Sequence, residues 1–167
     1  MFDLKIISHS ELESEILNEI ISVKSVPWDY SYENQLEWIN NNLKNNDLHL
    51  LLFMRNKSVA YLNLISIDLI IDKVSYKAFG VGNVCAIEKA KGYGKELMKL
   101  TNKFIVDNQK LGLLFCKSEL ASFYLMNNWR LVDKNKITLS FDDSNITSML
   151  YNFKGEYNSI IYNSRPF

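Results

Sequence analysis

The sequence predicts an α+β fold, in which a mixed, mostly antiparallel sheet of about six to seven strands is flanked by four helices. Three observations support this. Four segments carry apolar residues at helical spacing, and residues 48–87 read as consecutive strands. One helical segment, residues 93–108, lies between two strand patterns, which requires a parallel crossover. A chain of 167 residues suits a single domain, residues 1–167.

The first third of the chain predicts a short strand and two helices. Residues 2–7 form the strand, and Ser10 with Glu13 makes a capping box for the first helix. The apolar residues of that helix share one face: Leu12, Ile16, Leu17, Ile20 and Ile21. A loop at residues 27–30 then precedes Ser31, which we expect to cap a second amphipathic helix.

The middle of the chain predicts a sheet. Residues 48–54, 58–71 and 74–87 read as three strands of a meander, with a turn at residues 55–57. The helix at residues 93–108 and the buried strand at residues 111–116 then complete a right-handed parallel crossover.

The last third predicts a helix and short strands. Ser118 is expected to cap a fourth helix that runs through residue 127. Four strand-like runs follow, at residues 129–133, 136–141, 146–153 and 159–162.

Composition excludes several classes of protein. No apolar stretch approaches the roughly 18 residues of a membrane span, and the first ten residues lack the pattern of a leader, so we expect a cytoplasmic protein. Lys plus Arg equals Asp plus Glu at 19 each, which argues against the broad basic face of a nucleic-acid binder. Cys85, Cys116, His9 and His49 lack zinc or disulfide spacing. We therefore expect two buried thiols and no metal.

The segment 84–98 predicts an anion-binding cradle. An apolar strand breaks into a basic, glycine-bearing turn that leads directly into a helix, whose first N–H groups have no internal partner. Gly92 and Gly94 allow close approach of a ligand to the backbone, and Lys89, Lys91 and Lys95 add positive charge. The ligand is expected to be a small polyanion.

Two common phosphate motifs do not fit this segment. Gly94-Lys95 lacks the earlier glycine of a Walker motif and is followed by Glu96 in place of Ser or Thr. Gly80-Val81-Gly82 lies within a strand, and Cys85 stands where a dinucleotide fingerprint has its third glycine.

Two motifs of the chain resemble those of the GCN5-related N-acetyltransferases. The first is Lys89-Ala90-Lys91-Gly92-Tyr93-Gly94, with lysine where the family has Arg or Gln. The second is the strand at residues 111–116 followed by residues 123–129, in which Asn128 replaces a glycine that ends a helix in a left-handed conformation. The chain is most similar to the aminoglycoside 2'-N-acetyltransferase branch.

The resemblance implies acetyl-CoA as co-substrate and direct transfer of the acetyl group to a primary amine of a small molecule. It implies that the coenzyme is bound by Gly82, Asn83, Val84, Cys85, Lys89, Ala90, Lys91, Gly92, Tyr93, Gly94 and Lys95. A backbone N–H of residue 84 or 85 would polarise the thioester. The glycines of this strand are also explained by a bulge or kink.

Tyr124 is implied as the general acid that protonates the sulfur of coenzyme A, since phenols keep their proton at neutral pH. The alternative is that Tyr124 is a packing residue beside Phe123. Cys85 as a nucleophile is disfavoured, because neither motif contains a histidine.

Four residues are expected to face the amine: Asp29, Asp142, Asp143 and Phe167. The acid that serves as base in the branch is missing at residues 78–80, which leaves water or Asp29. A non-catalytic acyl-CoA-binding module and a peptide or protein N-acetyltransferase remain the alternative functions. The C-terminal strands are able to pair across a homodimer.

Overall fold

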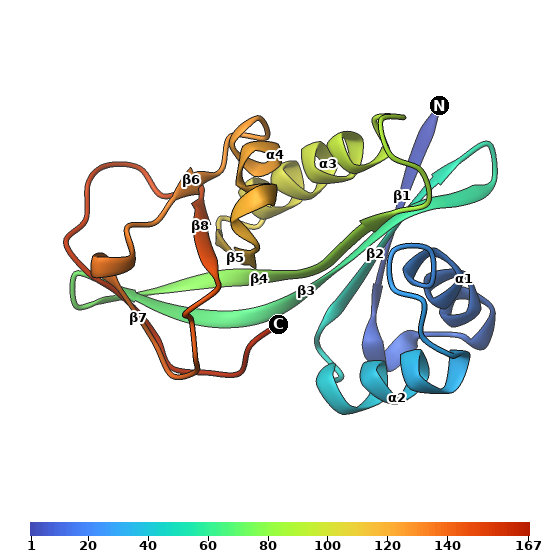
Figure 1. Cartoon of the computed structure of the whole chain (residues 1–167), viewed down its shortest axis with the longest axis horizontal. Helices are drawn as coiled ribbons and strands as arrows, with labels where there is room; N and C mark the ends of the chain where they lie inside the picture. The colour runs from blue at the N-terminus through green and yellow to red at the C-terminus, as the bar shows by residue number, and fades with distance from the viewer. The chain divides into compact units, whose positions relative to one another are not determined.

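The computed structural model describes residues 1–167 and has an α+β fold with a mixed sheet, as the sequence predicts (Figure 1). The chain divides into two compact units. Unit 1 contains Met1–Ile65 and Gly82–Thr101, and unit 2 contains Ser66–Val81 and Asn102–Phe167. Three elements contribute to both units: β3 (Lys57–Ile71), β4 (Val74–Ala86) and α3 (Tyr93–Asp107).

Unit 1 is built on an antiparallel ladder. Strand β1 (Phe2–Ser8) pairs with β2 (Leu48–Met54), which pairs with the first part of β3. Arg55 and Asn56 join β2 to β3 with φ values of 51° and 62°, the left-handed pair that a two-residue hairpin requires. Helices α1 (Ser14–Lys24) and α2 (Tyr32–Asn42) lie beside this ladder (Figure 1).

Of the two helix starts predicted in unit 1, that of α2 is confirmed and that of α1 is wrong. Ser31 is the N-cap of α2, and its Oγ accepts the N–H of Asn34 at 3.2 Å, which confirms the prediction. The capping box at Ser10 is wrong. The chain first forms a 3₁₀ turn, His9–Glu11, and α1 begins only at Ser14 without a side-chain cap. Glu11 instead accepts a hydrogen bond from Ser8 Oγ at 2.9 Å.

Unit 2 contains the parallel crossover. The first part of β4 pairs in parallel with β5 (Leu111–Cys116) over Ala78–Val81, and β5 pairs with β8 (Thr147–Tyr151), which pairs with β6 (Arg130–Leu131). Asp72 and Lys73, with φ values of 46° and 71°, join β3 to β4 in another two-residue turn. Helix α4 (Ala121–Leu125) follows a 3₁₀ turn at Ser118–Leu120, which makes it shorter than predicted and leaves Ser118 without a capping role.

The remaining strands of unit 2 lie within strand-like runs that the sequence analysis predicted separately. Strand β7 (Ile137–Leu139) pairs in parallel with β9 (Ile160–Tyr162), and β9 pairs with the end of β3. The sheet therefore has nine strands and a second parallel pair. Strands β6, β7 and β9 are two to three residues long, shorter than the predicted runs at residues 129–133, 136–141 and 159–162.

The burial of β3 changes along its length. Residues 58–65, in unit 1, are buried without interruption, whereas residues 66–71, in unit 2, alternate between exposed and buried. A strand covered on both faces reads as a continuous apolar run, and a strand with one wet face alternates. β3 is therefore covered on both faces in unit 1 and on one face in unit 2.

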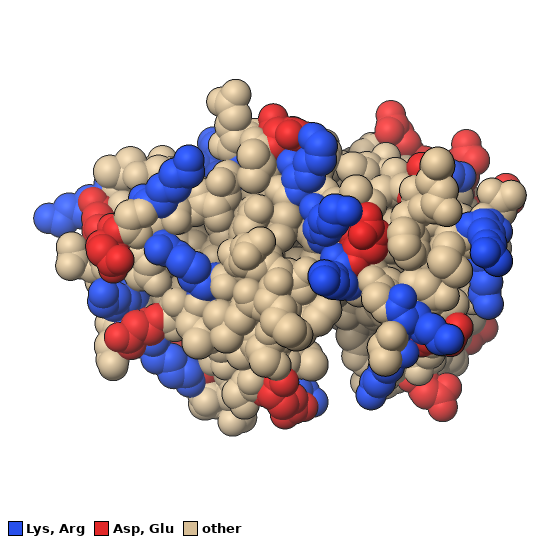
Figure 2. Space-filling model, turned by 90° about the horizontal axis from the view of Figure 1, so that it is seen from above, with Lys and Arg blue, Asp and Glu red and all other residues tan.

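The surface and the helices add two observations. On the face shown in Figure 2, Lys and Arg side chains are interspersed with Asp and Glu, without one extended surface of a single sign. None of the helices is both long enough and apolar enough to span a membrane.

Candidate functional site

The predicted cradle lies in unit 1, where β4 ends and α3 begins. Residues 87–92 form bends and a turn, in which Ala90 and Gly92 have left-handed φ values of 60° and 80°. The first helical hydrogen bond runs from Glu96 N to Gly92 O at 3.0 Å. Gly92 is therefore the N-cap, and the N–H groups of Tyr93, Gly94 and Lys95 precede the first intrahelical bond. Three adjacent amides and a helix dipole make this turn an anion-binding position.

The lysines around the turn differ in their availability. Lys91 lies 4.0 Å from Glu88 in an exposed ion pair, whereas Lys89 and Lys95 are exposed and form no ion pair. An exposed pair at that distance is worth little, so Lys91 can also turn toward an anion. The structure thus brings together all three predicted lysines at the start of α3.

Tyr93 has a role that the sequence analysis missed. Its side chain is buried, and its ring packs edge-on against Phe2 of β1, with ring centroids 6.2 Å apart. The phenol is therefore part of the core of unit 1, and only the backbone N–H of Tyr93 faces the cradle. An aromatic residue at the first helical position gives no sign of whether it packs or binds.

The end of β4 carries a second backbone irregularity. Asn83 has a φ value of 54°, in the left-handed region that interrupts a regular strand, and its Nδ2 donates to Asn63 Oδ1 at 2.7 Å. The predicted glycine kink therefore exists, but its left-handed residue is Asn83, beside Gly82. Asn83 and Val84 are half-buried, and Cys85 is buried.

Both cysteines are free and buried, as predicted. Burial raises the pKa of the Cys85 thiol to about 12, although the charge of Lys24 and a hydrogen bond from the Tyr61 main chain oppose that shift. Burial also raises the pKa of Cys116. A thiol that stays protonated at neutral pH is a poor nucleophile, which agrees with the packing role expected for Cys85.

Tyr124 lies in unit 2, next to the last residue of the short helix α4. It is buried, and its ring contacts Phe123 edge-on at 5.0 Å between centroids. Asn128 is left-handed with a φ value of 67°, and the N–H groups of Asn128 and Trp129 bond to Leu125 O at 3.0 Å and Tyr124 O at 3.1 Å. This is a Schellman ending with asparagine in the glycine position, as the sequence analysis predicts.

The second motif has a structural explanation in unit 2. A Cβ atom on Gly112 would lie 2.6 Å from the Trp129 ring, so only glycine leaves room for this indole. Trp129 Nε1 donates to Asn102 Oδ1 at 2.9 Å, and Asn102 Nδ2 donates to Asn127 O at 2.8 Å. The motif thus fixes the end of α4, and hence Tyr124, against α3 and β5.

The predicted acceptor residues occupy two places. Asp29 is exposed in the loop between α1 and α2, in unit 1. In unit 2, Phe167 packs on Phe115 with ring centroids 4.8 Å apart, and Phe115 also contacts Phe141, the residue before Asp142. The structure therefore brings Phe167 and the loop of Asp142 and Asp143 to one aromatic cluster.

Asp142 makes its main interactions within its own turn. Its Oδ1 accepts the N–H of Ser144 at 3.0 Å, and this hydrogen bond lowers the pKa of the carboxyl. Lys134 Nζ donates to the backbone oxygens of Asp143 and Ser144 at 3.0 and 3.1 Å. The loop is held in shape by these contacts, while the Asp143 carboxylate remains available for a cation.

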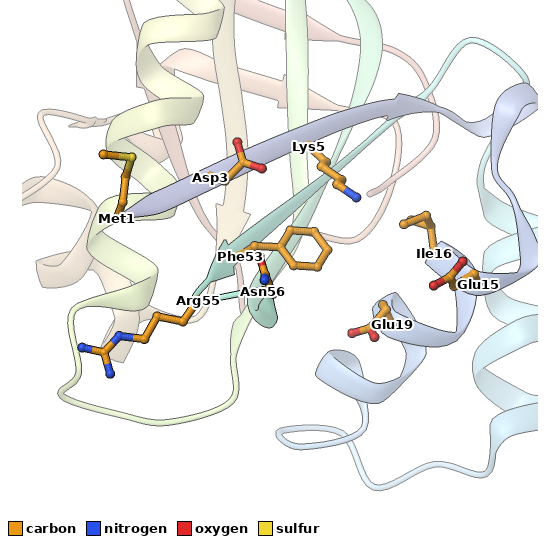
Figure 3. A pocket seen from close by; sticks show the side chains of 9 residues that line it. All are labelled: Met1, Asp3, Lys5, Glu15, Ile16, Glu19, Phe53, Arg55 and Asn56. Atoms are coloured by element: carbon orange, nitrogen blue, oxygen red, sulfur yellow. The ribbon is translucent and has the colours of Figure 1, made fainter.

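Unit 1 also has a pocket of about 590 Å³ that contains none of the predicted site residues (Figure 3). It lies between α1 and the strands β1 and β2, and it is lined by Met1, Asp3, Lys5, Glu15, Ile16, Glu19, Phe53, Arg55 and Asn56. Lys5 Nζ lies 4.9 Å from the centre of the Phe53 ring, and Glu19 accepts a hydrogen bond from Ser58. Charges of both signs line the pocket.

No group of three or more His, Cys, Asp or Glu side chains is arranged to hold a metal ion. The two histidines instead form a hydrogen-bonded chain with Tyr61, which the sequence analysis did not foresee. The available signal was a histidine in the otherwise apolar run of residues 48–54.

Comparisons with known proteins find the same fold among solved structures. No protein-family model matches the chain, and no curated protein sequence matches it. Among solved structures, Escherichia coli ElaA is 18% identical, with 91% of this chain and 100% of that chain covered and a TM-score of 0.65. An acyl-CoA N-acyltransferase from Pseudomonas aeruginosa is 15% identical, with the same coverage and a TM-score of 0.65.

A third solved structure contains the coenzyme. PaiA N-acetyltransferase from Thermoplasma acidophilum, in complex with coenzyme A, is 18% identical, with 90% of this chain and 99% of that chain covered and a TM-score of 0.58. At these identities the comparisons show that the chain shares the fold of these proteins.

Proposed function

We propose that this protein is an acetyl-CoA-dependent N-acetyltransferase, and that residues 1–167 act as one catalytic domain. The acetyl group passes directly from the thioester to a primary amine of a small molecule, and an aminoglycoside-like amine is our specific proposal for the acceptor. Two observations support this proposal. The two motifs resemble those of the GCN5-related N-acetyltransferases, and the chain shares its fold with solved N-acyltransferases.

The observation that carries the proposal is the turn at the start of α3. Gly92 caps the helix with a left-handed φ of 80°, and the N–H groups of the next three residues precede the helical ladder. A diphosphate accepts hydrogen bonds from such amides and is attracted by the dipole of a 15-residue helix. Lys89 and Lys95, which are exposed and unpaired, add charge beside it.

The pantetheine arm of the coenzyme would lie along the end of β4. Backbone groups of Gly82 and Asn83 would hydrogen-bond to it as to an added strand. A backbone N–H of Val84 or Cys85 would meet the thioester oxygen as it gains charge during the reaction. Asn83 has a left-handed backbone, and its side chain is held by the hydrogen bond to Asn63. This backbone turns the N–H and C=O groups at the end of β4 away from the directions they would have in a regular strand.

Tyr124 is the proposed acid for the departing thiolate. Its backbone oxygen accepts both N–H bonds from the residues that close α4, Asn127 and Trp129, so the position of the residue is fixed by the Schellman ending. The amine would be attracted by Asp29, Asp142 and Asp143, with Phe167 as an aromatic wall. Of these, Asp143 is better suited than Asp142, whose carboxylate is occupied by Ser144.

A thiol-release screen tests this function. Aminoglycosides, polyamines and short peptides are offered with acetyl-CoA to the wild type, to Tyr124→Phe, and to the matched control Tyr76→Phe, which removes a hydroxyl from a half-buried ring that packs edge-on against Phe153. We expect turnover with small amines, a fall in kcat of about 100-fold in Tyr124→Phe, and wild-type kinetics in the control.

The alternatives give different results in the same screen. If acetyl-CoA stabilises the fold but thiol release stays at background across the panel, the protein is a non-catalytic acyl-CoA-binding module. If only peptides are acetylated, the small-molecule acceptor is wrong while acetyl transfer stands. If Tyr124→Phe retains the wild-type kcat, Tyr124 is a packing residue.

A further inference from the structure

The outer edge of strand β1 is open. β1 ends the strand order of the sheet and pairs only with β2, in a register that runs without a bulge from Phe2 to Ser8. It contains no proline, and a hollow of about 420 Å³ adjoins its residues 5–7, so this edge is accessible. A strand of seven residues at the edge of a sheet offers a row of unpaired N–H and C=O groups to another strand.

The ladder shows which backbone groups of β1 point outward. His9 N donates to Asp47 O at 2.8 Å, and these two residues continue the register of β1 with β2. Along an antiparallel strand, the N–H and C=O groups of successive residues point alternately toward the paired strand and away from it. Three residues of β1 lie an odd number of positions from His9, so their backbone groups point to the open edge: Phe2, Leu4 and Ile6.

One face of β1 carries an apolar row that the chain covers only in part. Phe2 packs against Tyr93 of α3, and Leu4 and Ile6 lie on the same face of the strand, two and four positions further on. Phe2 and Leu4 are half-buried, and Ile6 is 38% exposed. The residues of β2 opposite Leu4 and Ile6 are fully buried, so the cover is incomplete only at the edge strand.

The other face of β1 carries two opposite charges. Asp3 and Lys5 are exposed and line the pocket between α1, β1 and β2 (Figure 3). Lys5 Nζ lies over the ring of Phe53, and neither Asp3 nor Lys5 forms an ion pair within the chain. Two charges of opposite sign, two positions apart on an edge strand, can pair with the same two charges on an antiparallel copy of that strand.

Opposite charges meet in one register of an antiparallel pair of β1 strands. Asp3 faces the partner's Lys5 only if the two-fold axis passes through Leu4, and Lys5 then faces the partner's Asp3. Because the backbone groups of Leu4 point outward and those of Asp3 and Lys5 do not, the charged pairs are the closely spaced ones, with Cα atoms about 4.5 Å apart. An axis at Asp3 or at Lys5 would place two like charges directly opposite each other, which is destabilising. The charges of β1 therefore favour a second copy of β1, in this register.

We propose that two copies of this protein associate through β1, with the two strands antiparallel about a two-fold axis at Leu4. Leu4 then packs against the partner's Leu4, and Phe2 against the partner's Ile6, which covers the apolar row. The outward-pointing residues face one another in the same register, and each such pair exchanges two backbone hydrogen bonds. The ladder of β1, β2 and β3 in one protomer thus continues into that of its partner.

This interface differs from the C-terminal pairing that the sequence analysis expected for a homodimer. Strands β6 and β7 each have an unpaired outer edge, but they are two and three residues long, whereas β1 has seven residues. The C-terminal strands therefore offer fewer backbone hydrogen bonds to a second copy than β1 does. The β1 dimer does not rest on the proposed acetyl transfer and is tested separately from it.

Charge reversal in the full chain tests the interface. Lys5→Asp and Asp3→Lys each place like charges opposite each other at both charged pairs, and the double variant Asp3→Lys/Lys5→Asp restores opposite charges in the same register. Both positions are exposed, so the fold should be retained, and thermal unfolding checks this. Lys73→Asp is the control, since it makes the same change of net charge as Lys5→Asp, at an exposed turn of unit 2. Sedimentation velocity over a range of concentrations gives the Kd of the dimer.

A cysteine placed on the axis tests the register. In the proposed dimer, the Cα atoms of Leu4 and the partner's Leu4 are about 5.5 Å apart, which a disulfide can span. Ile6 lies four residues along the strand from its own copy, or about 13 Å, which a disulfide cannot span. Leu4→Cys should therefore form a disulfide-linked dimer on mild oxidation and Ile6→Cys should not, since both native cysteines are buried.

The interface predicts a wild-type dimer whose Kd rises about tenfold or more in each single reversal and stays near the wild-type value in the double variant and in Lys73→Asp. A folded wild type that remains a monomer at every soluble concentration overturns the proposal. A dimer whose Kd is unchanged by both reversals uses another surface, such as the C-terminal strands, and overturns it too. A folded double variant that does not regain the wild-type Kd, or a disulfide in Ile6→Cys and none in Leu4→Cys, contradicts the register and with it the interface.

Discussion

Substitution of Gly112 by alanine gives the sharpest stability prediction for this fold. A Cβ atom at this position would lie 2.6 Å from Trp129 Cη2 and 3.2 Å from both Trp129 Cζ3 and Ile105 Cδ1. Carbon atoms that are not bonded prefer about 3.5–4.0 Å. The new methyl group therefore cannot be accommodated unless the indole moves by about an ångström.

The indole has little freedom to move. Trp129 is 1% exposed, its Nε1 donates to Asn102 at 2.9 Å, and its ring stacks on Tyr151 with centroids 5.3 Å apart. Overpacking of a filled core costs about 1–3 kcal/mol, and loss of the buried hydrogen bond adds about 1 kcal/mol. We expect Gly112→Ala to destabilise the protein by about 2–4 kcal/mol, which lowers Tm by roughly 4–16 °C at this chain length.

A double-mutant cycle with Trp129→Phe measures the clash itself. The smaller ring vacates the space, so Gly112→Ala should cost much less in the Trp129→Phe background than in the wild type. Denaturant unfolding, followed by circular dichroism, gives both differences. If Gly112→Ala leaves the wild type unchanged, or costs the same in both backgrounds, the contact between β5 and Trp129 does not explain the second motif.

Three further predictions concern the cradle, a helix cap and a buried lysine. Gly92→Ala meets no atom within 4 Å but forces alanine to a φ of 80°, and about 1–2 kcal/mol of strain should weaken acetyl-CoA binding about tenfold in calorimetry. Ser31→Ala removes the oxygen that caps α2 and should lower the free energy of unfolding by about 0.5–2 kcal/mol. Burial lowers the pKa of Lys24 from 10.5 to about 8, so the unfolded state binds more protons between these values and stability rises with pH there. Lys24→Met should lack that rise in unfolding experiments across the same range.

The first two of these predictions have a matched control variant. Ala90→Gly places glycine at the other left-handed position of the turn, φ 60°, and should leave coenzyme binding intact. Ser10→Ala, at the capping box that does not form, should leave the free energy of unfolding unchanged. The argument for the cradle is contradicted if Gly92→Ala and the wild type bind acetyl-CoA equally well. The argument for the cap is contradicted if Ser31→Ala and Ser10→Ala lower the free energy of unfolding equally. The argument for the lysine is contradicted if the stability of Lys24→Met rises with pH as steeply as that of the wild type.

Periodicity predicted the regular elements because their residues bury one face. The strands Leu48–Met54 and Leu111–Cys116 have the predicted bounds, since both are apolar runs with abrupt polar ends. The start of α1 was missed because a 3₁₀ turn, His9–Glu11, forms first, with Ser8 Oγ donating to Glu11. The capping box of Ser10 with Glu13 matches a local pattern, and that pattern does not show that the chain forms this turn before the helix.

The cradle was predictable, and the histidine chain was not. The turn at residues 89–95 is local, so its lysines, glycines and helix start are visible in the sequence. The contact of His9 with His49 depends on the register of β1 and β2, and that of His49 with Tyr61 on the hairpin at Arg55 and Asn56. A shift of one residue would turn these side chains to the opposite face, so only the folded ladder reveals the chain.

Amide resonances followed during a titration with acetyl-CoA test the central claim most directly. The account predicts that the largest shifts fall on the N–H groups of Gly92, Tyr93, Gly94 and Lys95, and that adenosine, which lacks the diphosphate, does not reproduce them. If acetyl-CoA binds and these four amides stay in place, or if no amide of the chain responds, the turn at the start of α3 is not where the coenzyme is held.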